Sequence, residues 1–112
     1  MSTKIMVSFK KIEDIFVFDI AGEIDETNAD NAFKYIFDNF FGNKIIYDLS
    51  KLEYGNSKFL GYLSSMNEFI EEKDGKMVIL KPTTRLADTL YMAGINKIIS
   101  IVDSIDAALL LF

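Results

Sequence analysis

The chain of 112 residues is half hydrophobic and carries a formal net charge of -5, with twelve Lys and Arg against seventeen Asp and Glu. This length suits one domain with a real core, and an acidic chain without a basic cluster disfavours both nucleic acid and an anionic membrane surface as partners. The sequence holds no Cys and no His, which removes thiol chemistry, the commonest metal ligand and the usual general base near neutral pH. We therefore expect a protein that is not an enzyme and that uses no cofactor and no metal.

The N-terminal sequence MSTKIMVSFKK has no long apolar segment of the kind that a signal peptide needs. No apolar run approaches the roughly 20 residues of a membrane-spanning helix. The sequence also shows no internal repeat and no segment of low complexity. These features predict a cytoplasmic protein in which residues 1–112 form a single domain.

Two strands open the chain. Apolar residues alternate with others at Ile5, Val7 and Phe9, as in a half-buried strand. Residues 15–20 form a denser run of β-branched and aromatic residues, which is typical of a more central strand. The short polar segment between the two runs predicts an antiparallel hairpin. Gly22 is expected to end the second strand.

A helix and a third strand follow. Thr27 or Asn28 can cap the helix, and its apolar residues recur at steps of three and four between residues 29 and 40. Gly42 suits the helix stop, because glycine accepts the left-handed conformation of a C-cap. Residues 44–49 predict the third strand.

The second helix begins near Asn56 or Ser57 and ends at the break formed by Asp74 and Gly75. Its spacing predicts an apolar face made of Phe59, Leu60, Leu63, Met66, Phe69 and Ile70. Residues 77–80 then predict a short fourth strand.

The last third of the chain adds a helix, a strand and another helix. The residues after Pro82 lead into the third helix, which Gly94 ends. Residues 98–102 predict the fifth strand. Asp103 can cap a last short helix that ends at Phe112.

This order of elements predicts an α/β fold. After the opening hairpin, every link between strands passes through a helix, and right-handed crossovers then favour parallel pairing. We expect a mixed, mostly parallel sheet of about five strands with an antiparallel edge strand and about four helices. Such sheets place functional groups in the loops after the carboxyl ends of the strands, here the loops that start at Gly22 and Leu49.

The first of these loops, residues 22–25 with the sequence GEID, leads into the first helix. Asp25 precedes the helix cap, where the positive end of the helix dipole favours a carboxylate. Asp25 is therefore either an acidic turn residue or part of a binding face shared with the second loop.

The second loop, residues 48–61 with the sequence DLSKLEYGNSKFLG, leads into the second helix. Asn56 or Ser57 makes a sound N-cap, which is a sufficient explanation for Ser57 taken alone. The alternative is that the Ser57 hydroxyl takes a phosphate. The free N–H groups and positive dipole end of a helix N-terminus stabilise such a dianion, and Lys58 adds a positive charge.

Together, these two segments resemble the two landmark segments of STAS domains, as found in bacterial anti-sigma-factor antagonists. The order of the elements and Gly94 within MAGINKIISI fit the same family, and the likeness covers nearly the whole chain. The resemblance implies a single STAS domain and a regulatory protein that binds an anti-sigma factor which is also a serine kinase. In that family the kinase phosphorylates a serine of the second segment, phosphorylation blocks the binding, and a serine phosphatase reverses it.

Carried onto this sequence, the resemblance puts the phosphorylated serine at Ser57. The expected partner-binding residues are Asp25, Asn56, Ser57, Lys58 and Phe59. Three of them depart from the family motif, because Asn56 replaces Asp, Lys58 replaces Ser or Thr, and Phe59 replaces Gly. Asn56 removes a negative charge beside the hydroxyl, Lys58 makes the loop more favourable to phosphate, and the bulky Phe59 changes the docking surface.

Two other functions stay open on the sequence alone. The altered motif fits a STAS domain without a serine switch, acting as a structural or scaffold subunit of a signalling complex. The third function is an enzyme or small-ligand binder that uses Asp25 and Asp48 at one end of the sheet. The lack of His, of Cys and of a metal-ligand cluster argues against this third function.

Overall fold

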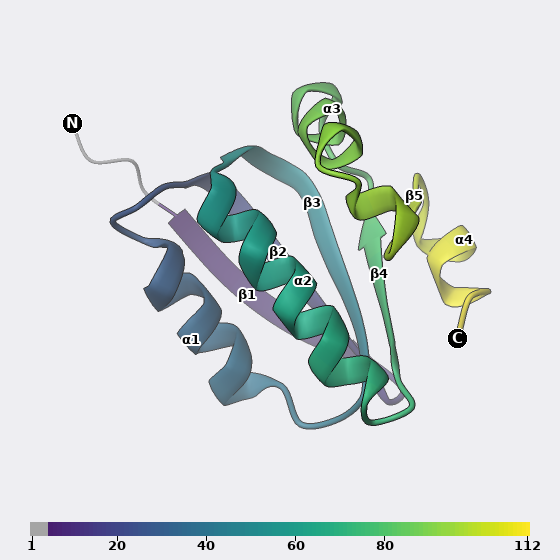
Figure 1. Cartoon of the computed structure of the whole chain (residues 1–112). Coiled ribbons are helices and arrows are strands. Elements are labelled where there is room, and N and C mark those ends of the chain that lie inside the picture. The colour runs from purple at the N-terminus through teal and green to yellow at the C-terminus, as the bar shows by residue number, and fades with distance from the viewer. Residues whose placement is uncertain (1–4) are drawn as a thin grey trace.

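The computed structural model describes residues 5–112, and its five strands lie in the sheet in the order of the chain (Figure 1). The strands are β1 (Ile5–Ile12), β2 (Ile15–Ile24), β3 (Lys44–Gly55), β4 (Lys76–Leu80) and β5 (Ser100–Val102). β1 pairs antiparallel with β2, and the later pairs are all parallel. The predicted mixed sheet with one antiparallel edge strand is therefore confirmed.

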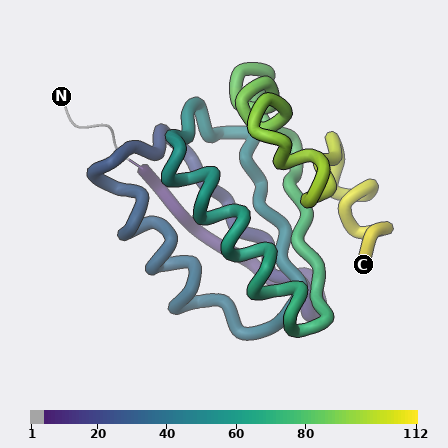
Figure 2. Tube along the Cα trace, in the orientation of Figure 1, coloured from purple at the N-terminus to yellow at the C-terminus, as the bar shows by residue number. Residues whose placement is uncertain are grey.

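The helices cover the two faces of this sheet unequally. They are α1 (Ala29–Asn39), α2 (Ser57–Glu71), α3 (Thr84–Met92), the short 3-10 helix η1 (Ile95–Lys97) and α4 (Ile105–Leu109). The long α1 and α2 lie side by side across one face, and α3 packs on the same face through Leu86 and Leu90 (Figure 1, Figure 2). The five-residue α4 packs on the opposite face through Ala108. Within residues 5–112, no helix has the length and apolar content to cross a bilayer.

The core beneath α1 and α2 is rich in aromatic side chains. Successive residues of a strand point to opposite faces, so Phe16 and Phe18 of β2 face the long helices while Ile15 and Val17 face α4. The Phe18 ring centroid lies 6.4 Å from that of Tyr47 on β3. The first four residues of β2 are all buried, which confirms its predicted place as a more central strand than β1.

β2 and β3 both run further than the sequence predicts. β2 continues past Gly22 to Ile24, and β3 continues past Leu49 to Gly55. Gly22 has φ 108, and the pairing register with β3 shifts directly after it. Because glycine accepts this backbone conformation, the strand passes through a bulge where a stop was expected. The extra pairs carry both strands up to the N-terminus of α2.

Two helix boundaries also differ from the prediction. α1 ends at Asn39 and the next residue is extended, so Gly42 is not its C-cap. α4 is capped by Ser104 rather than Asp103, because the Ser104 hydroxyl accepts a hydrogen bond from the backbone N–H of Ala107 at 3.1 Å. Both differences lie outside the region of the predicted site.

The stop of α3 is close to its predicted place. The helix ends at Met92, and Gly94 follows with a left-handed φ of 77. η1 comes next, so the fifth strand starts at Ser100 and is shorter than the predicted run over residues 98–102.

Candidate functional site

The two predicted loops meet at the N-terminus of α2. β2 and β3 are parallel neighbours, and their last paired residues are Ile24 and Gly55. The backbone N–H of Asn56 donates a hydrogen bond to the Ile24 carbonyl at 3.2 Å. The chain therefore leaves both strands at one edge of the sheet, as expected for loops that follow parallel strands.

Asn56, and not Ser57, is the N-cap of α2. The Asn56 side-chain oxygen accepts a hydrogen bond from the backbone N–H of Phe59 at 3.0 Å. Ser57 is the first residue of the helix and is exposed. Its hydroxyl has no hydrogen-bond partner within residues 5–112. Asn56 therefore caps the helix, and the Ser57 hydroxyl is exposed and is not needed for the cap.

Asp25 holds the first loop in shape. One of its carboxylate oxygens accepts hydrogen bonds from the Thr27 hydroxyl at 2.6 Å, from the Thr27 N–H at 2.8 Å and from the Asn28 N–H at 3.2 Å. The bonds from Thr27, side chain before backbone, lower the pKa of Asp25. Asn28 braces the same turn, since its side-chain oxygen accepts from the Asp25 N–H at 3.0 Å. Asp25 is thus an ionised turn residue at the edge of the site.

The first loop touches the second through Glu26, which sequence reasoning missed. The Asn56 side-chain amide donates to the Glu26 carboxylate at 3.4 Å. Glu26 is exposed, so this contact leaves its charge at the surface beside the helix cap. Its sequence position gives no pattern that would single it out from other acidic loop residues.

Lys58 points across to α1. Its ammonium group lies 3.0 Å from a carboxylate oxygen of Asp30, and the Tyr62 hydroxyl donates to the other oxygen of the same carboxylate. These two partners, Tyr62 before Lys58, lower the pKa of Asp30, and Asp30 in turn raises the pKa of Lys58 and of Tyr62. The positive charge that was expected to favour phosphate is therefore already paired in this structure.

The sequence predicts that Phe59 contacts a partner, but the structure places its side chain inside the core. Phe59 is completely buried, and its ring centroid lies 6.0 Å from that of Phe33 on α1. Its ring fills the space above Gly55, where an added Cβ would sit 2.3 Å from a ring carbon. Phe59 therefore shapes the site from inside the core, and the surface here consists of its polar neighbours.

A shallow hollow of about 260 Å³ lies on the surface of α2. It is lined by Lys58, Gly61, Tyr62 and Ser65. A Cβ added at Gly61 would meet no atom within 4 Å, so packing within the described chain does not require glycine at this helical position. The hollow extends the exposed surface of the site along the helix.

The site lacks the ligands of a metal centre. Within residues 5–112, no group of three or more His, Cys, Asp or Glu side chains is arranged to hold a metal ion. The carboxylates of Glu26 and Asp30 contact Asn56 and Lys58 at the start of α2, and that of Asp25 is engaged by Thr27 within its own loop. The chemistry that the arrangement offers is an accessible hydroxyl in an acidic surface.

Comparison with known proteins places this architecture in one family. The model of the STAS domain matches residues 6–108. A Thermotoga neapolitana protein, described provisionally as an anti-sigma factor antagonist, is 28% identical over 107 residues, which are 93% of this chain and 95% of the relative.

Solved structures agree with this assignment. A Thermotoga maritima protein with the same provisional description superposes with a TM-score of 0.84 at 25% identity, over 92% of this chain and 91% of the other. The anti-sigma factor antagonist SpoIIAA shares the fold, with a TM-score of 0.78 at 15% identity for its unphosphorylated form, over 93% of both chains. A phosphorylated form of SpoIIAA, from Bacillus, superposes with a TM-score of 0.65 at 16% identity, over 93% of this chain and 96% of that one. On the match over residues 6–108, this chain belongs to the STAS domain family.

Proposed function

We propose that this STAS domain is an anti-sigma-factor antagonist that binds a serine-kinase anti-sigma factor and is switched by phosphorylation of Ser57. The observation that carries the proposal is the free, exposed hydroxyl on the first turn of α2. The binding surface consists of Asp25, Asn56, Ser57 and Lys58, with Phe59 supporting it from the core. A serine phosphatase would restore the binding form.

Electrostatics gives the proposed switch its direction. A phosphate on Ser57 adds about 1.5 to 2 negative charges at neutral pH. The loop already presents the carboxylates of Asp25 and Glu26, and Asp30 holds the ammonium group of Lys58 at 3.0 Å. A partner surface that fits the uncharged hydroxyl would meet a strongly negative patch after phosphorylation, and it would have to desolvate the new dianion.

The relatives support the proposal by their descriptions. The two Thermotoga proteins are described provisionally as anti-sigma factor antagonists, and SpoIIAA is named as one and is known in both phosphorylation states. The match to these proteins spans almost the full length of both chains, so the likeness concerns the whole domain.

The decisive experiment compares four baits in a pull-down from lysate of the native host, followed by mass spectrometry. The baits are the wild type, Ser57→Ala, Ser57→Asp and a charge-matched control, Ser8→Asp, at an exposed position of β1. We expect the wild type, Ser57→Ala and Ser8→Asp to retain a kinase-type ATPase, and Ser57→Asp to release it. Retention by Ser57→Asp at the level of Ser8→Asp would contradict the serine switch.

A second candidate function is a STAS domain without the serine switch, serving as a scaffold subunit. It is favoured by Asn56 and Lys58, which depart from the motif of the antagonists, and by the ion pair that engages Lys58. Incubation of the wild type with the retained ATPase and labelled ATP separates the two functions. Label on Ser57 supports the antagonist, whereas an equally retained but unlabelled domain supports the scaffold.

A further inference from the structure

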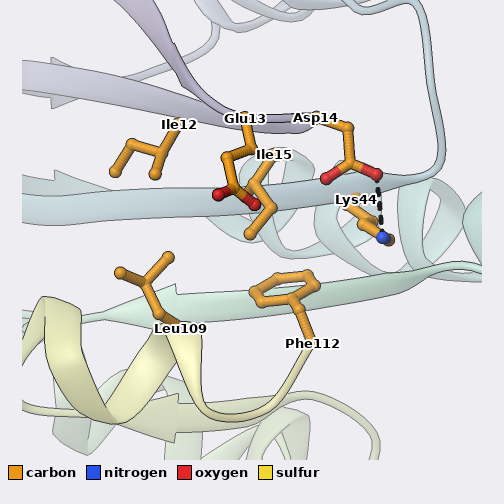
Figure 3. Close-up of a pocket in the computed structure, with 7 residues that line it drawn as sticks. All are labelled: Ile12, Glu13, Asp14, Ile15, Lys44, Leu109 and Phe112. Atoms are coloured by element: carbon orange, nitrogen blue, oxygen red, sulfur yellow. Dashed lines mark hydrogen bonds and ion pairs between the residues drawn. The ribbon is translucent and has the colours of Figure 1, made fainter.

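A second cleft lies at the other end of β3 from Ser57, on the sheet face that carries α4 (Figure 3). Its volume of about 340 Å³ falls within the range of small-molecule sites. Ile12 and Ile15, from the β1–β2 hairpin, form one wall, and Leu109 at the end of α4 and Phe112 beyond it face them from the other. These two facing walls of the cleft are therefore apolar, and the rest of its lining is charged.

Three charged side chains lie at the rim of this cleft. The Lys44 ammonium group lies 2.8 Å from a carboxylate oxygen of Asp14, and this bond lowers the pKa of Asp14. The exposed Glu13 has no ion-pair or hydrogen-bond partner for its carboxylate within residues 5–112. Lys76 is paired with Lys44 in the register of β3 and β4 but does not line the cleft. The unmatched charge at the rim is negative.

We propose that this cleft binds a small organic amine, with its ammonium group against Glu13 and its apolar part between the hairpin and α4. An ammonium ion supplies the positive charge that Glu13 lacks as a partner, and the apolar part covers the exposed portions of Ile12, Leu109 and Phe112, which are only partly buried. A carboxylate ligand would meet Glu13 and Asp14 as like charges, while Lys44 is already engaged.

The cleft is independent of the switch proposed for Ser57. None of its lining residues takes part in the α2 surface, and the sheet separates the two sites. Binding of an amine in this cleft therefore does not depend on whether the protein binds an anti-sigma factor.

The first test titrates isotope-labelled wild-type protein at neutral pH with 2-phenylethylamine, followed by amide NMR. The matched control ligand is 3-phenylpropionate, which has the same ring and a chain of similar length but the opposite charge. We expect the amine to shift the amide signals of residues 12–15 and 109–112, and the acid to leave them unchanged. Equal shifts from both ligands, or none from the amine up to about 10 mM, in the weak range for a small exposed site, would overturn the proposal.

Two variants with opposite expected signs exclude a merely structural effect. Glu13→Gln removes the unmatched charge and should weaken binding of the amine about threefold, the scale of an exposed ion pair. Lys44→Gln frees Asp14 as a second carboxylate and should strengthen binding by a similar factor. Lys34→Gln makes the same charge change in an exposed pair on α1 and should have no effect. Unchanged affinity in Glu13→Gln, or weaker binding in Lys44→Gln, would contradict the proposed contacts.

Discussion

The two faces of the sheet differ in how much of each is covered by helices and buried. On one face, α1, α2 and α3 cover a continuous core whose residues run along the chain from Phe16 to Ile99. On the other, α4 covers a small cluster around Ile46, and the next polar positions along that face are Asp19 and Asp48. The difference teaches that one layer of helices secures the fold, while the other face is free to hold clefts and charges.

β3 offers the sharpest comparison, because Ile45 and Ile46 are both completely buried and point to opposite faces. We expect Ile45→Ala to reduce the free energy of unfolding by about 3–5 kcal/mol, and Ile46→Ala by about 2–3 kcal/mol. The short α4 can settle into the space left at Ile46, whereas the three helices over Ile45 cannot. Chemical denaturation of both variants measures this. Equal losses would show that the two faces are equally rigid.

The carboxyl pair on the α4 face predicts a pH-dependent effect. Asp19 and Asp48 are opposite each other in the register of β2 and β3. Burial first, and then the hydrogen bond and charge of Asp48, raise the pKa of Asp19. For Asp48 burial acts in the same upward direction, but the hydrogen bonds from Ser50 and Asp19, together with the charge of Lys51, outweigh it, and the pKa of Asp48 is lowered.

The direction of the stability change with pH follows from which protonation state of Asp19 the folded protein favours. A raised pKa means that the protonated form is preferred, so its stabilising effect is present at acid pH and is lost as the pH rises through the folded pKa. Asp19→Asn should therefore stabilise the protein at pH 7, by less than about 1 kcal/mol because water screens both half-exposed groups. Denaturation at pH 7 and pH 3 tests this. A gain that persists undiminished at pH 3 would rule out ionisation as the cause.

On the face covered by α1, α2 and α3, a substitution at Tyr47 is expected to change the free energy of unfolding least. Its ring is completely buried and its hydroxyl has no hydrogen-bond partner within the described part of the chain, so burial raises its pKa. Tyr47→Phe removes an unsatisfied polar group and should change stability by about 0 to 1 kcal/mol in the favourable direction. Tyr62→Phe is the control, since it removes a hydroxyl that donates to Asp30. Clear destabilisation by Tyr47→Phe would mean that this hydroxyl has a partner in solution, such as an internal water.

The sequence predicts a strand correctly where its apolar residues form a dense run or alternate regularly. The dense apolar run at residues 15–20 and the alternation at residues 5–9 both mark real strands. The extension of β3 over residues 50–55 could not be predicted from the sequence, because apolar and polar residues do not alternate regularly in SKLEYG. Its pairing depends on the bulge at Gly22 of a neighbouring strand, which is a tertiary contact.

The candidate site shows a similar division. Local spacing identified the turn at Asp25 and the cap at Asn56 or Ser57, and helical periodicity already put Phe59 on the apolar face of α2. The expectation of a surface role for Phe59 came from the family motif and conflicted with that periodicity. Lys58 and Tyr62 on α2 contact Asp30 on α1, about 30 residues away in the sequence. No local sequence pattern predicts such a contact between two helices.

At the start of α2, Asn56 caps the helix while Ser57 is the proposed site of modification, and this separation affects how often the proposed switch can be used. Asn56 secures the helix end by its own hydrogen bond to the N–H of Phe59, and the Ser57 side chain holds nothing in place. A group added to Ser57 and later removed would therefore leave the helix intact at every stage. The molecule could pass through many cycles of modification as a fully folded protein, and protease sensitivity should stay constant throughout the cycle.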